Sequence, residues 1–226
     1  MFIFAPTLEA PDLHTIIWQE IQQKSGILLA TAYLPNTDYF RLLLSGKPIV
    51  LEKHEHYRKQ SYRNRCVIYS ANGPLVLSIP VIKQSLKEPI GDKRISYAEN
   101  WQNQHWRAIA SAYKNSPYFE YFEDEFRPFY EKEFEFLFDY NLQLLQCILK
   151  ILRQSPDLTF TEMYQKSNES VLDVREQIDP KKKTLFEYGP YYQVFSEKHG
   201  FIPNLSVIDL LFHEGINSLK YLQAIG

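Results

Sequence analysis

The dipeptide Asn72-Gly73 lies between two β-rich runs and is the feature that most constrains how this chain folds. The run "RCVIYS" (65–70) precedes the turn Ala71-Asn72-Gly73-Pro74, and "LVLSIPVI" (75–82) follows it. Asparagine and glycine accept the positive φ angles that a tight hairpin turn requires. The segment therefore predicts an antiparallel β-hairpin.

Strand and helix patterns alternate around this hairpin. A short apolar strand is predicted over 27–31, Asn36-Thr37-Asp38 supply N-capping chemistry for a helix over 39–46, and "KPIVLEKHEHY" (47–57) predicts a second strand. Helices dominate later in the chain. This order favours a single α/β layered domain with a mixed sheet that includes the hairpin and with a helix-rich second half. An α+β arrangement is the alternative.

The second half of the chain is predicted to contain four helices, three short strands and one polar loop. Helices are predicted over 101–116, from Pro128 in a first turn to about Arg153, over 206–213 and over 217–223. Short strands are predicted at 94–100, within 155–160 and from Tyr191 to Phe195, and 165–183 is predicted to be a polar loop with one short helix.

The length of 226 residues, about 45% of them hydrophobic, fits one domain with a sizeable core. Residues 1–25 are interpreted as an N-terminal extension, helical from about Leu13 to Lys24, and residues 26–226 as the domain itself. No signal peptide or membrane span is expected, so we predict a cytoplasmic protein with Cys66 and Cys147 as free thiols.

The net charge of −2 argues against a dedicated nucleic-acid binder. No phosphate-binding glycine motif, nucleophile elbow or zinc spacing occurs in the sequence, so no metal is expected and no cofactor is identified.

Positive charge gathers around the hairpin. Residues 47–94 contain ten Lys or Arg and four Asp or Glu. On a strand, Arg63 and Arg65 would point to one face and Asn64 to the other. Two neighbouring guanidinium groups need a counter-anion. That anion is either a ligand, which Lys59 would help to hold, or a carboxylate of the chain itself, such as Glu52 or Glu55.

Two further candidates are polar residues near predicted strand ends. "HEHY" would place His54 and His56 on one face of a strand, without a third metal ligand, and histidine exchanges protons near neutral pH. His54 is therefore the candidate general base. Asp38 either caps its helix or lies at an anion site of the strand-to-helix connection.

Several segments together resemble the WbqC-like protein family over about residues 26–223. They are "AYLPNTDYF", "IVLEKHEHYRKQSYRNRCVI", "ANGPLVLSIPV", "HWRAIASAYKNSPYF" and "YYQVFSEKHGFIPNLSVIDLLFHEGINSLKYL". The resemblance implies a cytoplasmic bacterial protein of surface polysaccharide synthesis, chiefly of O-antigen, that transfers an acyl or aminoacyl group to an amino sugar. The motif residues carried over are Tyr33, Pro35, Tyr39, Tyr57, Arg63, Asn64, Arg65, Trp106, Tyr113, Pro117, Tyr118, Gln193, Pro203, Asn204, Ser206 and Asp209.

These observations lead to a transferase hypothesis. In it Arg63 and Arg65 hold the anionic group of a nucleotide-sugar or acyl donor, Asn64 and Tyr57 orient the acceptor, and His54 is the base. The predicted catalytic residues are His54 and Asp38, and the predicted ligand-binding residues are Tyr33, Tyr39, Tyr57, Lys59, Arg63, Asn64, Arg65, Tyr113, Gln193, Asn204 and Asp209.

The chain departs from the family pattern in two places. Many members have an Asp-Asp pair where this chain has Lys53-His54, and the segment before the closing block is shorter here. A non-catalytic ligand-binding or scaffold protein is therefore the alternative function.

Overall fold

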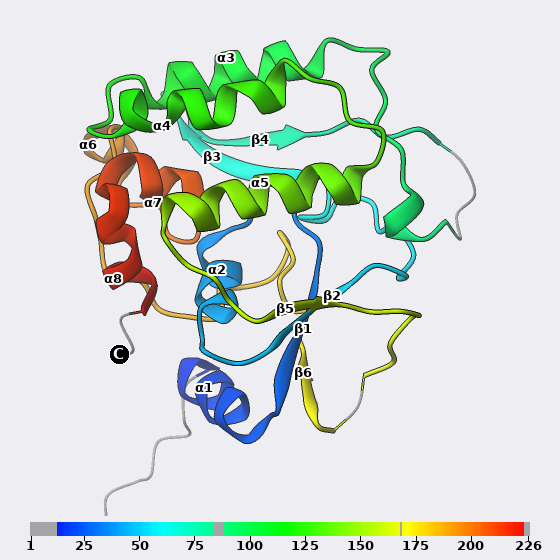
Figure 1. The fold of residues 1–226 in the computed structure, drawn as a ribbon. Helices are drawn as coiled ribbons and strands as arrows, with labels where there is room; N and C mark the ends of the chain where they lie inside the picture. The colour runs from blue at the N-terminus through cyan, green and yellow to red at the C-terminus, as the bar shows by residue number, and fades with distance from the viewer. Residues whose placement is uncertain (1–12, 84–87, 168, 224–226) are drawn as a thin grey trace, which may run out of the picture.

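A sheet of four parallel strands forms the centre of the protein, in a computed structural model that describes residues 13–83, 88–167 and 169–223 (Figure 1). Its strands are β1 (Gly26–Ala30), β2 (Ile49–Glu52), β5 (Leu158–Phe160) and β6 (Val171–Asp173), in the order β5-β2-β1-β6. Every residue of β1 is buried, as expected for an apolar central strand that is covered on both faces.

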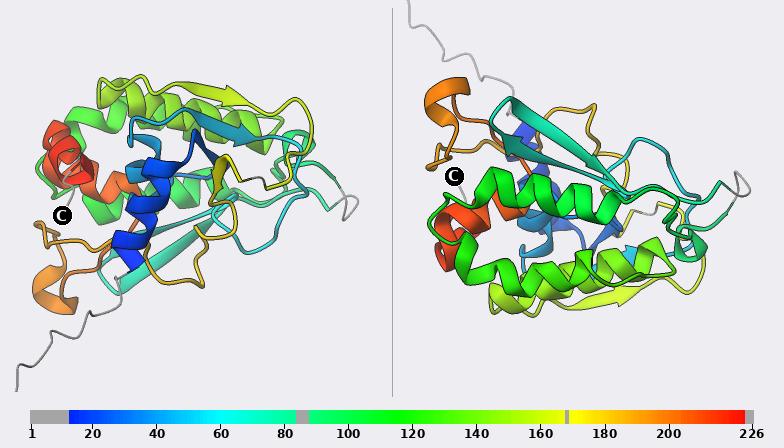
Figure 2. Two further views of the ribbon diagram at one scale, coloured as in Figure 1. Left: turned by 90° about the horizontal axis from the view of Figure 1, so that it is seen from below. Right: turned by 90° about the horizontal axis from the view of Figure 1, so that it is seen from above.

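Helices cover this sheet from both sides. Figures 1 and 2 show α5 (Leu137–Ile151) and α1 (Leu13–Gln23) on opposite sides of it. Asn141 of α5 donates a hydrogen bond to Thr31 Oγ1 (3.3 Å), while Ile17 and Ile21 of α1 belong to the hydrophobic core. The helix α2 (Thr37–Leu43) connects β1 to β2, and the side chain of Asn36 caps it by accepting from Tyr39 N.

The hairpin consists of β3 (Arg65–Ser70) and β4 (Gly73–Ser78), close to the predicted bounds. Gly73 has a φ of 97°, which explains the glycine at the turn. The α/β class is confirmed, but the hairpin forms a two-stranded sheet of its own instead of joining the larger sheet. It packs against α3 (Trp101–Tyr113), whose Tyr113 hydroxyl accepts a hydrogen bond from Tyr69 N (3.2 Å).

The remaining helices close the core around an aromatic centre. They are α4 (Phe119–Phe126), α6 (Ser196–His199), α7 (Val207–Glu214), α8 (Ser218–Gln223) and the 3₁₀ turns η1 (Ile90–Asp92), η2 (Arg127–Tyr130) and η3 (Gly215–Asn217). The ring of Phe212 lies 5.2 Å from the rings of Tyr113 and Phe119, and 5.5 Å from that of Phe126. These contacts join α3, α4 and α7.

Several predicted elements differ from the structure. Pro128 lies in η2, and the long helix begins only at Leu137. The strand predicted over 47–57 ends at Glu52, so His54 and His56 lie in a loop and do not share a strand face. Arg63 and Asn64 likewise precede β3. Within the loop between β2 and β3, a buried ion pair joins Glu55 to Arg63, two residues that the sequence pattern would place on strands.

Three other differences concern short segments. The strand β6 lies in the segment predicted to be a polar loop, because a three-residue strand has too few residues to show a pattern and exists through its pairing with β1. Residues 94–100 make only isolated bridges, and 191–195 form no regular strand.

A hydrogen-bonded group of rings is buried between β1 and α3. The Tyr33 hydroxyl lies 3.0 Å from His105 Nδ1 and 2.9 Å from the Tyr130 hydroxyl, and His105 also bonds to the backbone of Ser78. Burial lowers the pKa of His105 to about 4. The native protein therefore holds this imidazole neutral at pH values where the unfolded chain protonates it.

We expect this histidine to make the protein acid-sensitive. Between the ordinary histidine pKa of 6.5 and the native pKa of about 4, the unfolded state binds more protons, so stability falls as the pH falls through this window. The loss reaches roughly 3 kcal/mol for a shift of this size. Urea unfolding at a series of pH values should show this slope in the wild type and not in His105→Gln, whose amide can still donate and accept. Parallel curves for the two proteins would contradict the assignment.

Candidate functional site

The carboxyl ends of the parallel strands form one edge of the sheet. The chain adds β2 and β5 on one side of β1 and then places β6 on the other side. In open α/β sheets a crevice opens at the carboxyl ends where the strand order reverses in this way, and ligands commonly bind there. The edge beside β1 and β6 is therefore the expected position of a ligand site.

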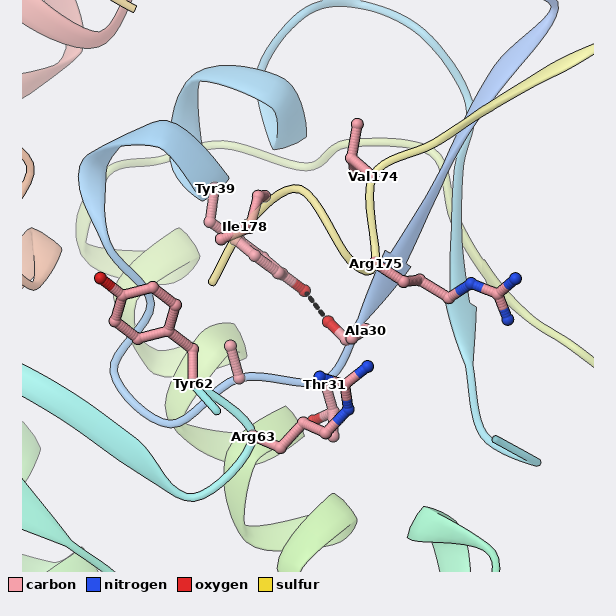
Figure 3. Close-up of a pocket in the computed structure, with 9 residues that line it drawn as sticks. Ala30, Thr31, Tyr39, Tyr62, Arg63, Val174, Arg175 and Ile178 are labelled. Carbon is pink, nitrogen blue, oxygen red and sulfur yellow. Dashed lines mark hydrogen bonds between the residues drawn. The ribbon is translucent and has the colours of Figure 1, made fainter. Parts of the chain in front are cut away.

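A narrow cavity lies at this position (Figure 3). Its volume of about 10 Å³ is enough for about one water molecule. The Tyr39 hydroxyl donates a hydrogen bond to Ala30 O (3.0 Å) at its wall, and burial raises the pKa of Tyr62 to about 12. The lining residues are Ala30, Thr31, Ala32, Tyr39, Tyr62, Arg63, Val174, Arg175 and Ile178.

A second and larger pocket shares Arg63 with this cavity and has a volume of about 450 Å³. It lies where the loop after β2 meets the loops on either side of β6. It is lined by His54, Glu55, His56, Arg58, Arg63, Tyr164 and Glu176. We call it the carboxyl-edge pocket. Its size is suitable for a small molecule, and its lining contains proton-exchanging and charged side chains.

Arg63 is neutralised by the chain itself. Its Nε and Nη2 donate to the two carboxylate oxygens of Glu55 at 2.7 and 2.6 Å, and both side chains are buried. Among the residues that the structure describes, Nη1 of Arg63 has no hydrogen-bond partner. The sequence left open whether the counter-anion of Arg63 is a ligand or a carboxylate of the chain. The structure shows the carboxylate of Glu55 in this position. Only one of its nitrogens remains for a ligand.

A buried carboxylate organises the loops around the carboxyl-edge pocket. Glu52, at the end of β2, is fully buried and accepts from His54 N (2.7 Å), Thr161 Oγ1 (2.8 Å), Gln165 N (2.9 Å) and Arg175 Nη1 (3.0 Å). It thereby joins the ends of β2, β5 and β6.

Arg175 completes this arrangement from the loop after β6. Its Nε and Nη2 donate to Asp173 at 2.9 and 2.6 Å, and these hydrogen bonds raise the pKa of the guanidinium. Its guanidinium carbon lies 5.3 Å from the centroid of the Tyr164 ring, which forms part of the pocket wall. Sequence reasoning missed Arg175, Asp173, Tyr164, Arg58 and Glu176. Polar residues directly after the apolar pair Val171-Leu172 were the available signal.

His54 is oriented within the pocket. Its Nε2 lies 3.1 Å from the carbonyl oxygen of Thr161, which can only accept. Nε2 therefore carries the hydrogen, and the lone pair of the neutral ring is on Nδ1. Nδ1 has no partner among the described residues. A histidine held in one tautomer with a free lone pair can accept a proton from a bound molecule.

The other predicted residues near Arg63 differ in their surroundings. Asn64 is buried and donates to Ile79 O (2.8 Å). Arg65 is half-buried, and within the described part of the chain its Nε has no partner. The ring of Tyr57 lies 5.3 Å from Lys93 Nζ, and its pKa is raised by burial, which the charges of Arg65 and Arg63 oppose. Lys59 is exposed.

Asp38 and Asn204 join the start of α2 to two distant loops. Asp38 accepts from Leu185 N (2.9 Å), the Tyr188 hydroxyl (2.6 Å) and Asn204 Nδ2 (2.8 Å), and Asn204 Oδ1 accepts from Asp38 N. Burial raises the pKa of Asp38 in spite of these donors. The first amide groups of α2 thus have partners within the chain, and this arrangement stabilises the fold without presenting an anion site.

Tyr113, Gln193 and Asp209 come together in the core, away from both cavities. The Asp209 carboxylate accepts from the Tyr113 hydroxyl (3.0 Å), from Gln193 Nε2 (2.9 Å) and from the Tyr191 hydroxyl (2.5 Å). Burial raises the pKa of Asp209. Tyr33 is likewise buried, in the ring group with His105. Of the predicted site residues, the structure places His54 and Arg63 in the carboxyl-edge pocket, and Tyr39 with Arg63 in the narrow cavity.

The described residues offer neither a metal site nor a membrane span. No group of three or more His, Cys, Asp or Glu within ranges 13–83, 88–167 and 169–223 could hold a metal ion. In the same ranges no helix has the length and apolar character needed to cross a membrane.

Comparisons with known proteins give two matches. The model of the WbqC-like protein family matches residues 31–187. The uncharacterised protein Rv1507c of Mycobacterium tuberculosis (strain ATCC 25618 / H37Rv) is 25% identical over 227 residues, which cover 88% of this chain and 98% of that protein. No solved structure matches the chain.

Proposed function

The chain belongs to the WbqC-like protein family, and from this premise we propose that it is a transferase of surface polysaccharide synthesis, including that of O-antigen. Its reaction moves an acyl or aminoacyl group from an activated, anionic donor to an amino sugar. The carboxyl-edge pocket is the reaction site. The single observation that carries the proposal is that one pocket combines an oriented histidine lone pair with the guanidinium groups of Arg58 and Arg63.

The chemistry requires a proton acceptor and a site for negative charge. The amino nitrogen of the sugar attacks the carbonyl carbon of the donor, and the bond to the leaving group breaks with its electron pair. His54 Nδ1 accepts the proton that the nitrogen loses. Arg63 Nη1 faces the negative charge of the donor, while Glu55 holds the rest of that guanidinium in place.

Ligand binding can be tested by thermal unfolding. At a tenfold excess over its dissociation constant, a nucleotide-sugar or acyl donor should add about 1.4 kcal/mol of stability and raise the midpoint by roughly 3–6 °C for a chain of this length. If no member of either donor class stabilises the wild type, the proposal loses its basis.

Replacing His54 with glutamine tests the chemical step. We expect kcat to fall about 100-fold, with donor binding retained, because a positioned general base contributes about this much or more. The matched control is His199→Gln, since His199 is exposed beside the hairpin turn, where it contacts Ala71 O. Equal rates for the wild type and His54→Gln would exclude His54 as the base.

A non-catalytic ligand-binding protein or scaffold is the second candidate, and one observation favours it. Glu55 already neutralises Arg63, so the buried cation of the pocket has less attraction for a donor. Under this alternative a ligand stabilises the wild type and His54→Gln equally, and no transfer product forms.

A further inference from the structure

We infer that Arg58 recognises the anionic group of the ligand as a phosphate or pyrophosphate, and that Glu176 holds the Arg58 guanidinium until the ligand displaces it. The inference rests on the proposed function in that it assigns a recognition residue and an anion class to the same pocket.

The three arginines around the carboxyl-edge pocket are bound differently. Arg63 and Arg175 are buried, and each donates two hydrogen bonds to one carboxylate. The Arg58 guanidinium only approaches carboxylates, with Nη1 at 3.2 Å from Glu176 and Nη2 at 3.5 Å from Asp179. It donates a hydrogen bond to no residue of the described ranges. The Arg58 guanidinium is thus held by these two ion pairs alone, which an incoming anion can exchange.

Because both side chains are exposed, an anion can replace Glu176 as the partner of Arg58 at little cost in free energy. Solvent reaches 42% of the Arg58 side chain and 77% of the Glu176 side chain. Exposed ion pairs of this kind contribute little stability because water screens them and both side chains lose freedom. The pair between Arg63 and Glu55 is buried and cannot separate at comparable cost. An anion that enters the pocket will therefore displace Glu176 from Arg58 before it disturbs Arg63.

The geometry of the donors favours a phosphate. A guanidinium group presents a planar fork that matches two oxygens of a phosphate, and the doubly charged group competes better than one carboxylate. His54 and His56 line the same pocket and can supply further hydrogen bonds. The Tyr164 ring is 53% exposed at the wall, where it offers a flat surface to a nucleoside attached to the phosphate.

Calorimetric titration of the full chain with inorganic pyrophosphate and with uridine diphosphate tests this inference at low ionic strength. Loss of charge-assisted hydrogen bonds in Arg58→Ala should weaken binding of both probes about tenfold or more. Glu176→Gln should tighten binding about threefold, since it removes the competing carboxylate of an exposed pair. Lys114→Ala is the control, because Lys114 is an exposed cation at the end of α3 and does not line the pocket.

Each outcome decides a separate point. If Arg58→Ala binds pyrophosphate like the wild type, Arg58 is not the recognition residue, whereas the proposed function stands if transfer activity persists. If Glu176→Gln weakens binding, Glu176 is not a competitor. If the wild type binds uridine diphosphate more strongly than pyrophosphate, and Tyr164→Ala binds the two equally, the source of the anion is a nucleotide. If the wild type already binds the two probes equally, a nucleotide is excluded. If the wild type neither binds an anion nor transfers a group, the proposed function fails as well.

Discussion

Replacing Glu55 with alanine is expected to lower the free energy of unfolding by about 3–5 kcal/mol, because it leaves the buried guanidinium of Arg63 without a counter-charge. Only 4% of the Arg63 side chain and 10% of the Glu55 side chain are exposed, and two short hydrogen bonds join them. The carbonyl of Arg63 also accepts from Asn141 of α5 (2.7 Å), so its displacement would disturb the contact with this helix. Urea unfolding measures the effect.

The exposed pair of Arg94 and Glu135 is a suitable control. Its atoms are also close, at 2.8 Å, but the two side chains are 49% and 56% exposed. Glu135→Ala should therefore cost at most about 1 kcal/mol. In addition, Arg63→Met combined with Glu55→Leu should be more stable than Glu55→Ala, because an apolar pair removes the uncompensated charge. Similar losses in Glu55→Ala and Glu135→Ala would show that burial does not set the strength of this interaction.

The second large effect is expected at Glu52. Glu52→Ala should lower the free energy of unfolding by about 3–5 kcal/mol, since it leaves Arg175 and the other donors unpaired in the interior. Glu52→Gln should cost less, because its amide oxygen still accepts hydrogen bonds at one of the two positions. Chemical denaturation at neutral pH is the measurement.

The consequences of Glu52→Ala should extend to the ligand. Glu52 holds the backbone of His54 and the loop that carries Tyr164, so its loss should also weaken donor binding in the carboxyl-edge pocket. Glu162→Ala is the control, because Glu162 is an exposed carboxylate in the same loop. It should change stability by no more than about 0.5 kcal/mol. If Glu52→Ala unfolds like the wild type, Glu52 does not organise this edge of the sheet.

Local patterns predicted much of the backbone. The hairpin over β3 and β4, the helix α3 and the C-terminal helices α7 and α8 lie within a few residues of their predicted positions. Each of these elements depends on neighbours in the sequence, such as the Asn72-Gly73 turn or an apolar face with helical spacing. The predicted start of the long helix at Pro128 was wrong, since α5 begins at Leu137. Proline is equally suited to the 3₁₀ turn η2, where Pro128 lies.

The candidate site could be predicted only in part. The sequence indicated positive charge beside the hairpin and named Glu55 among the carboxylates able to neutralise it. It did not indicate that Arg58 would be held only by ion pairs to Glu176 and Asp179 while Arg63 is hydrogen-bonded by Glu55, because the two arginines carry the same charge and differ only in what surrounds them. Asp38 was predicted to be catalytic and Asp209 to bind a ligand. In the structure both carboxylates are buried and accept hydrogen bonds from the chain itself.

The sequence by itself determined the class of the fold, since apolar runs, turn residues and helical spacing act over a few neighbouring residues. The tertiary structure alone decided where the pocket lies and which charges remain available in it. The reason is that these properties depend on contacts between distant residues, as between Glu52 and Arg175, which are 123 positions apart. Burial then decides how strongly each charge is held, and burial is a property of the folded chain.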